Sequence, residues 1–355
     1  LFVPENARHF KYATRHISDD GAVGLIERLL EIVGYLREIN DQHENWEIRE
    51  QWLSSLLAEL WHGRGLYPGL LACLDYLKFS QAIPYAIHQM ETREQQAIKD
   101  ELFAFIQAES DEIDGLDLTA KDIKDIRKKW QRLYPAQQAL LAEVLPRFDL
   151  QTRQIAKILE KPESASVYSS HEAIAANPYI LCEEYIGEDP DDQITFRQID
   201  QGVIPSPDLG GEAIFDPDDW QRLRGLCIRQ LRASPQHTFL RADQILFQIN
   251  TRLSYLPEWK RAHFTLRDLE INQTYLAAAL TFRTVDDEQY LYVRTIFEDE
   301  REIETVLREL VNRPDIPLRF PVQESHWRSY LHSAKSELAQ SFPTKYDEAI
   351  VQQVE

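Results

Sequence analysis

Few residues in this chain have the types and the spacing that catalysis needs. His171 and Glu172 begin the HExxH pattern of zinc proteases, but Ala175 stands where the second metal-binding histidine belongs. A P-loop needs a glycine followed by lysine and then serine or threonine, and none of the 12 glycines precedes a lysine. The sequence therefore predicts neither zinc-dependent proteolysis nor P-loop nucleotide hydrolysis by this chain.

Two further arrangements that could support hydrolysis are also incomplete. Asp208 and Glu212 have the order of an acidic pair in a metal-dependent nuclease, but Ile214 stands where a lysine would stabilise the transition state. Cys182 is followed by two glutamates, whose negative charge raises a thiol pKa and opposes its use as a nucleophile. We therefore expect this chain alone to turn over no substrate and to hold no metal or cofactor.

Basic residues are concentrated in one part of the chain. Residues 117–163 contain ten basic and seven acidic side chains, a local charge of +3. Phosphate contacts are expected from Lys121, Lys124, Lys128, Arg153 and Lys157. The alternative is that KDIKDIRKK forms an ordinary solvated helix face, in which Asp122 and Asp125 pair with the neighbouring lysines.

The overall composition argues against a general nucleic-acid role. Fifty-nine acidic and 39 basic residues give a formal charge of -20, which repels a polyanion unless positive charge is concentrated locally. Cys73, Cys182 and Cys227 are isolated from one another, which favours a reducing cytoplasm over disulfides or a CxxC metal site. We expect no secretory signal and no membrane span. Because the chain begins with Leu1, we expect it to be a piece of a longer polypeptide.

Apolar spacing predicts a mainly α-helical, multi-domain protein. Helices are expected over residues 21–40, 44–62 and 68–79, with a long helix through residue 107 and three short helices between 119 and 161. The first helix has the spacing of one apolar face at Leu25, Leu29, Ile32, Val33 and Leu36. The predicted domains are an all-helical domain (1–112), a helical-hairpin segment (113–190), a winged-helix-like α/β module (191–311) and a connector with a final helix (312–355).

A helical run is interrupted at Asn177-Pro178-Tyr179. The residue before a proline is disfavoured in the α-helical region, so the chain is expected to turn there. We predict that this corner joins two helices and that Tyr179 packs beneath it. A turn without DNA contact and a role in guiding a DNA strand both remain open.

The region after residue 218 has the element order of a winged helix. A helix over 218–233, a strand at His237–Leu240, two more helices, the second over 265–280, and a hairpin turning at Asp286-Asp287-Glu288 are expected. Winged helices bind DNA or serve as protein docking modules. In this chain Arg267, in the helix that would read DNA, is followed by Asp268 and Glu270, which favours docking.

Several of these pieces together resemble the region that precedes the motor in RecD-like superfamily 1 DNA helicases. The matching pieces are FDLQTRQIAKILE, AIAANPYILCEEY, ITFRQIDQGVIP, RLRGLCIRQLRASPQHTFLRADQIL, QYLYVRTIFEDEREIETVLREL and YDEAIVQQVE. Their order is preserved over roughly residues 115–355. The hairpin turns lack the GxG with which a helix-hairpin-helix brings backbone N–H groups onto a phosphate.

The resemblance implies an accessory, DNA-positioning region of an ATP-dependent helicase. ATP and Mg²⁺ would be cofactors of the longer protein, and the downstream motor domains would be partners of this region. The alternative is a non-catalytic protein-interaction scaffold in a DNA repair or defence complex. The acidity of the chain and the charged helix 298–310, with apolar Ile303, Val306, Leu307 and Leu310 on one face, favour this alternative.

Overall fold

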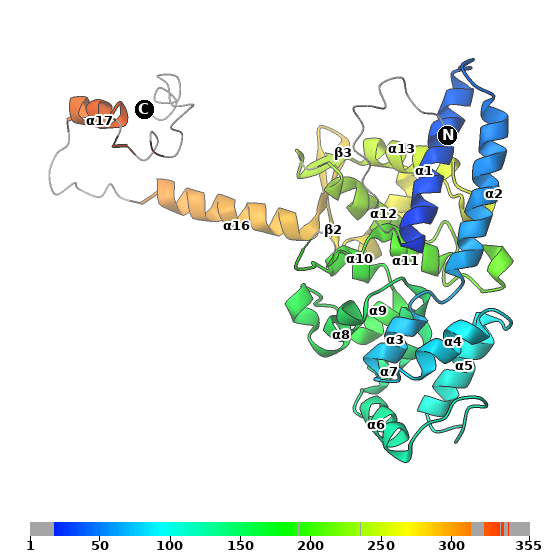
Figure 1. The fold of residues 1–355 in the computed structure, drawn as a ribbon. Coiled ribbons are helices and arrows are strands. Elements are labelled where there is room, and N and C mark those ends of the chain that lie inside the picture. The colour runs from blue at the N-terminus through cyan, green and yellow to red at the C-terminus, as the bar shows by residue number, and fades with distance from the viewer. Residues whose placement is uncertain are drawn as a thin grey trace. The chain divides into compact units, whose positions relative to one another are not determined.

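The structure is a computed structural model that describes residues 18–189, 192–234, 236–313, 323–333, 335–336 and 340. The chain divides into two compact units, Leu1–Glu298 and Asp299–Glu355. Its described residues form α-helices and one three-stranded antiparallel sheet, which confirms the predicted mainly helical fold (Figure 1). The domain boundaries proposed near residues 112, 190 and 311 stay predictions.

The helices of the first unit follow one another closely along the chain. They are α1 (Asp19–Glu38), α2 (Trp46–Arg64), α3 (Leu70–Tyr76), α4 (Ala82–Gln89), α5 (Gln95–Ile106), α6 (Ala120–Gln131), α7 (Pro135–Ala139), α8 (Thr152–Glu160), α9 (His171–Ala176), α10 (Ile180–Glu184), α11 (Phe196–Val203), α12 (Trp220–Arg232), α13 (Ala242–Ser254), α14 (Leu266–Ile271) and α15 (Gln273–Leu276). Helix α16 (Arg294–Val311) begins in this unit and continues into the second, which also contains α17 (Glu324–Leu331).

Helices α1 and α2 lie side by side (Figure 1). The Ser18 hydroxyl accepts a hydrogen bond from the backbone of Gly21 at the start of α1. Val23 of α1 packs into a small core with Leu57 and Trp61 of α2. The apolar face expected on α1 is only partly buried: Val33 is 6% exposed, but Leu25, Leu29 and Ile32 are 53%, 37% and 44% exposed. The contacts with α2 and with α11 therefore use a different side of α1 than the spacing indicated.

The predicted helices between residues 68 and 161 form, with two changes. The long helix expected through residue 107 is two helices, α4 and α5. The middle helix of the 119–161 group begins at Pro135 as α7, continues as a π-helical turn over Leu140–Val144 and ends as a 3₁₀ turn over Leu145–Arg147. Pro146 explains the change, because its ring cannot occupy a regular α-helix interior.

Buried apolar side chains form one connected main core in the first unit. It runs from Leu66 to Val293 and includes Phe79, Phe148 and Tyr179, so residues on both sides of the boundaries proposed near 112 and 190 belong to it. In the part of the chain that the structure describes, no helix is both long enough and apolar enough to cross a membrane.

The sheet lies beside α12 and α13 (Figure 1). Its strands are β1 (Phe239–Arg241), β2 (Leu280–Val285) and β3 (Glu288–Val293), in the order β1-β3-β2. Asp286 and Asp287 both have positive φ (50° and 63°), as a two-residue hairpin turn requires, which confirms the predicted turn. The single helix expected over 265–280 is broken at Asn272 into α14 and α15.

Candidate functional site

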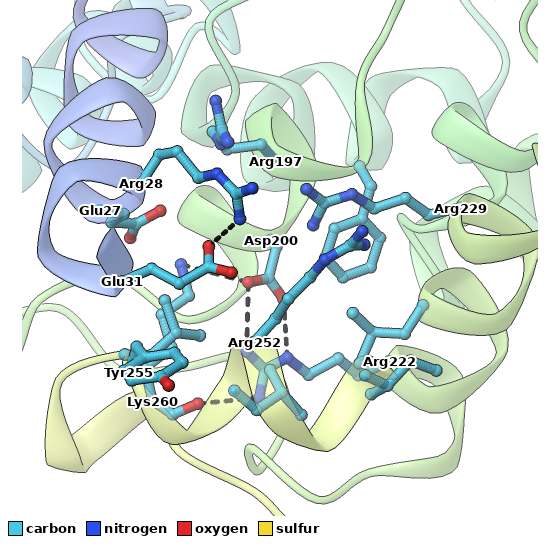
Figure 2. A pocket seen from close by; sticks show the side chains of 15 residues that line it. Glu27, Arg28, Glu31, Arg197, Asp200, Arg222, Arg229, Arg252, Tyr255 and Lys260 are labelled. Atoms are coloured by element: carbon cyan, nitrogen blue, oxygen red, sulfur yellow. Dashed lines mark hydrogen bonds and ion pairs between the residues drawn. The ribbon is translucent and has the colours of Figure 1, made fainter. Parts of the chain in front are cut away.

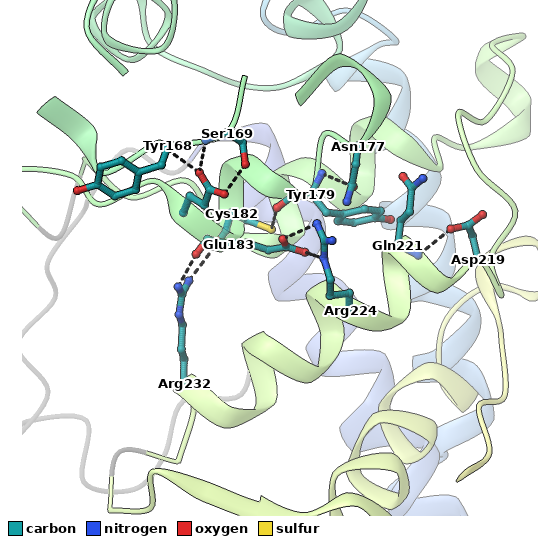
Figure 3. Close-up of polar contacts among 11 residues, drawn as sticks. Tyr168, Ser169, Asn177, Tyr179, Cys182, Glu183, Asp219, Gln221, Arg224 and Arg232 are labelled. Carbon is teal, nitrogen blue, oxygen red and sulfur yellow. Dashed lines mark hydrogen bonds and ion pairs between the residues drawn. The ribbon is translucent and has the colours of Figure 1, made fainter. Parts of the chain in front are cut away.

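The Asn177-Pro178-Tyr179 corner joins α9 to α10, as predicted (Figure 3). Asn177 leaves the helical region (φ -142°, ψ 89°), and its side-chain oxygen accepts a hydrogen bond from the backbone N–H of Tyr179 at 3.1 Å. The Tyr179 side chain is completely buried and stacks on Phe196 of α11, with ring centroids 5.4 Å apart. The expected packing of Tyr179 beneath the corner is confirmed.

A buried carboxylate joins this corner to two other parts of the chain. The Tyr179 hydroxyl donates to Oδ1 of Asp200 at 2.8 Å, and Arg222 of α12 donates to the same oxygen at 2.8 Å. The ammonium nitrogen of Lys260 lies 3.2 Å from Oδ2 of Asp200. Burial alone would raise the pKa of Asp200, but Arg222 and Lys260 lower it well below its ordinary value. Asp200 is therefore an ionised, fully paired centre of the core.

A second buried ion pair holds the other end of α10. Both carboxylate oxygens of Glu183 accept from the guanidinium of Arg224, at 3.0 and 2.8 Å (Figure 3). Arg232 donates to the carbonyl oxygens of Cys182 and Glu183. Burial and then the Glu183 carboxylate raise the pKa of the Cys182 thiol well above its ordinary value, which confirms the expected direction. The sulfur is thus buried and protonated.

The basic residues predicted to contact phosphates fall into two groups, on α6 and on α8, which lie apart in Figure 1. On α6, the side chains of Lys121, Lys124 and Lys128 are exposed, and within the described residues none of them forms an ion pair. Asp122, which could have neutralised them, accepts hydrogen bonds from Thr119 at the start of the helix. These lysines therefore form an exposed basic face, which they share with exposed Asp125, four residues after Lys121 and three before Lys128.

Two other basic residues of α6 point into the protein. The Lys129 ammonium lies 3.7 Å from the centre of the Tyr76 ring, and it also donates to the Tyr76 carbonyl oxygen. Arg127 donates to the carbonyl oxygen of Ser110 at 2.7 Å. The inward and outward basic residues of this helix therefore have different roles, because the inward ones attach α6 to the core.

The α8 group is already neutralised by acids. The Lys157 ammonium lies 2.9 Å from Glu188 and 3.0 Å from Asp192, and the Arg153 guanidinium lies 3.6 Å from Asp192. The Asp192 side chain is completely buried. The hydrogen bonds that Lys157 donates to the carboxylates of Glu188 and Asp192 raise its pKa. A DNA phosphate would have to compete with these carboxylates for Arg153 and Lys157.

A strongly basic pocket lies between α1, α11, α12 and α13, with a cavity volume of about 320 Å³ (Figure 2). Six basic side chains and three acidic ones line it, a local charge of +3 in a chain whose formal charge is -20. Some of these charges are already paired, since Arg28 forms an ion pair with Glu31, and Arg222 and Lys260 are paired with Asp200.

Three guanidinium groups in this pocket have no acidic partner in the part of the chain that the structure describes: Arg197 of α11, Arg229 of α12 and Arg252 of α13. Figure 2 shows the ends of Arg229 and Arg252 near one another, whereas the guanidinium group of Arg197 lies against Gly24 of α1. Burial, and then the positive charges of Arg252 and Arg197, lower the pKa of Arg229. Three like charges held together in this way repel one another, and an anion between them would relieve the repulsion.

Glu27 of α1 also lines the pocket. One carboxylate oxygen of Glu27 is buried and has no hydrogen-bond partner within the described residues. The pocket thus offers several hydrogen-bond donors and, within the described residues, one unused acceptor. Sequence reasoning missed this site because its residues come from four separate helices, of which α1 lies far along the chain from α11, α12 and α13. The repeated arginines of WQRLRGLCIRQLR were the available signal, since arginines among apolar residues indicate buried guanidinium groups.

The incomplete zinc motif has a structural role. Nε2 of His171 lies 2.9 Å from the carbonyl oxygen of Ile158. Among the described residues, no group of three or more His, Cys, Asp or Glu side chains could hold a metal ion.

Comparison of the chain with family models, curated proteins and solved structures gave no match.

Proposed function

We propose that this chain is the accessory region of an ATP-dependent RecD-like DNA helicase and positions DNA for a motor that lies outside the chain. One observation carries the proposal: three of the sequence pieces that resemble this family meet in a single buried network. Tyr179 belongs to the AIAANPYILCEEY piece, Asp200 to ITFRQIDQGVIP and Arg222 to RLRGLCIRQLR. Each piece alone is a weak match to the family. Because the three pieces form one structural unit, their preserved order supports the resemblance to RecD-like helicases.

The exposed lysines of α6 are the part of this unit proposed to contact DNA. Within the described residues Lys121, Lys124 and Lys128 form no ion pair that a phosphate would have to displace. Arg153 is paired with Asp192, and Lys157 with Glu188 and Asp192. Phosphate contacts by lysines position DNA without reading its sequence. We therefore expect binding through α6 to be insensitive to sequence and sensitive to salt.

The module after residue 218 is proposed to be a winged helix that docks a protein. Its order of helix, strand, helix, helix and hairpin, with strand order β1-β3-β2, supports the fold. In the helix that would read DNA, Asp268 forms a capping box with Thr265, and exposed Leu266 and Ile271 flank it. An apolar surface without excess positive charge suits a protein partner better than a phosphate backbone.

The test is the affinity of the whole chain for a 5'-tailed DNA duplex at low salt. Replacing Lys121, Lys124 and Lys128 with glutamine should weaken binding by at least about tenfold, because three phosphate contacts are removed. The control replaces Arg49, Arg93 and Arg301 with glutamine, which removes the same charge from exposed residues that are already paired with acids. Absence of binding, or an equal loss in both variants, would refute a DNA role for α6.

A second candidate function is a protein-interaction scaffold. Helix α16 favours it, because Ile303, Val306, Leu307 and Leu310 share one face and are 48% to 59% exposed. A scaffold should keep its protein partner after nuclease treatment and should lose it when Leu307 is replaced by aspartate. A partner that is released by nuclease would instead support the DNA-positioning function.

A further inference from the structure

We propose that the pocket between α1, α11, α12 and α13 binds a terminal phosphate group, that is, a phosphomonoester whose organic part carries hydrogen-bond donors. This site goes beyond the proposed DNA contacts of α6, because it is formed by other helices and requires no helicase motor. Its residues are Glu27 and the arginines Arg197, Arg229 and Arg252, which have no acidic partner among the described residues (Figure 2).

The charge of the pocket selects for an anion. Within the pocket, Arg28 is neutralised by Glu31, and Arg222 by Asp200. The remaining charged side chains are four cations, Arg197, Arg229, Arg252 and Lys260, and one acid, Glu27. Lys260 is itself 3.2 Å from Asp200, so the three arginines supply the free positive charge. Guanidinium groups are weakly hydrated and stay charged when partly buried, so they can hold an anion away from bulk water.

The number of donors favours phosphate over carboxylate. A carboxylate has two oxygens, which a single guanidinium fork can satisfy, whereas a terminal phosphate has three acceptor oxygens and a charge of about -1.5 to -2 at neutral pH. Three guanidinium groups supply enough N–H donors for all three oxygens. A phosphodiester inside a DNA strand carries one charge and two free oxygens, and it would leave one arginine unmatched.

The Glu27 carboxylate indicates what the rest of the ligand carries. Its buried oxygen without a partner would repel a second phosphate but would accept a hydrogen bond from a hydroxyl or amino group. A volume of about 320 Å³ is at the small end of ligand pockets, so one phosphate and its attached sugar fit better than an extended chain. Two sources supply this chemistry, a free mononucleotide and the 5'-phosphorylated end of a DNA strand.

The experiment compares matched probes on the unmodified chain. AMP is compared with adenosine by calorimetry, and a 5'-phosphorylated single strand is compared with the same strand ending in a 5'-hydroxyl by fluorescence anisotropy. The proposal expects the phosphorylated member of at least one pair to bind at least about tenfold more tightly. Preference in the AMP pair alone identifies a free nucleotide, and preference in the DNA pair alone identifies a strand end. Equal binding within both pairs would overturn the proposal.

Variants then locate the site. Arg252→Gln should abolish the phosphate preference, Arg252→Lys should restore part of it, and Arg49→Gln, on the exposed side of α2, should leave it unchanged. A preference that survives both Arg252→Gln and Arg229→Gln would place the phosphate elsewhere and contradict the proposal. Because the α6 lysines are intact throughout, this result is independent of the test of DNA positioning: either proposal can fail while the other holds.

Discussion

Replacing Asp200 with asparagine tests the buried network most severely. The change keeps the shape of the side chain and a hydrogen-bond acceptor for Tyr179, but it removes the negative charge between Arg222 and Lys260, whose side chains are 0% and 2% exposed. Breaking a buried ion pair by removing one partner costs about 3–5 kcal/mol, because the remaining charge stays buried without compensation. We therefore expect Asp200→Asn to lower the free energy of unfolding by about 3–5 kcal/mol.

Two companion variants separate charge from hydrogen bonding. Tyr179→Phe removes one hydrogen bond to the same carboxylate and should cost only about 1.5 kcal/mol. Asp200→Asn leaves two buried cations without a counter-charge, and adding Lys260→Met removes one of them. The double variant should therefore lose less free energy of unfolding than the sum of the losses in the two single variants. Asp111→Asn is the matched control, since Asp111 is 96% exposed and its loss should cost less than about 0.5 kcal/mol.

Urea unfolding, followed by tryptophan fluorescence and circular dichroism, measures these four variants and the single variant Lys260→Met, which completes the double-mutant cycle. The reasoning is refuted if Asp200→Asn costs less than Tyr179→Phe. It is also refuted if Asp200→Asn and Lys260→Met are simply additive, because a shared buried charge cluster requires coupling between them.

Two further predictions concern acid stability and the attachment of α6. Although burial opposes it, Arg222 and Lys260 lower the pKa of Asp200, so its contribution to stability is complete above the unfolded-state value of about 3.9 and is lost as pH falls toward the folded-state value. The urea midpoint of the unmodified chain should therefore fall between pH 4 and pH 2 more steeply than that of Asp200→Asn, and parallel curves would contradict this. Lys129→Ala should lower the free energy of unfolding by about 1–2 kcal/mol, because a cation–π contact and a hydrogen bond to Tyr76 are lost. Lys128→Ala, at the neighbouring exposed position, should change the free energy of unfolding by less than about 0.5 kcal/mol. Equal losses in the two variants would show that Lys129 does not anchor the helix.

Local features of the fold could be predicted because their causes are local. The Asn177-Pro178-Tyr179 corner follows from the restricted backbone of a residue before proline, and the hairpin follows from two aspartates between strand-forming runs. The long helix expected through residue 107 and the helix over 265–280 were each predicted as one piece. Apolar periodicity continues across a short break, so it does not reveal where a helix stops.

The sites themselves depend on contacts between distant residues, which periodicity does not encode. Asp200 meets Arg222 and Lys260 only because α11, α12 and the turn after α13 pack together. Likewise, the exposure of Leu25 and Leu29 on α1 is decided by where α2 and α11 pack. The lysines of α6 could be predicted to be exposed from their spacing, but the pairing of Lys157 with Asp192, 35 residues away, could not.

The salt dependence of DNA binding tests the central claim, that this chain positions DNA through an exposed basic face, most directly. The affinity for a 5'-tailed duplex is measured from low to physiological salt for the unmodified chain. It is also measured for the variant in which Lys121, Lys124 and Lys128 are replaced by glutamine. Each lost phosphate contact lowers the slope of log affinity against log salt by about 0.7–0.9, so the triple glutamine variant should have a slope smaller by about 2–3. An identical slope in both proteins, or no binding even at the lowest salt, would contradict the claim.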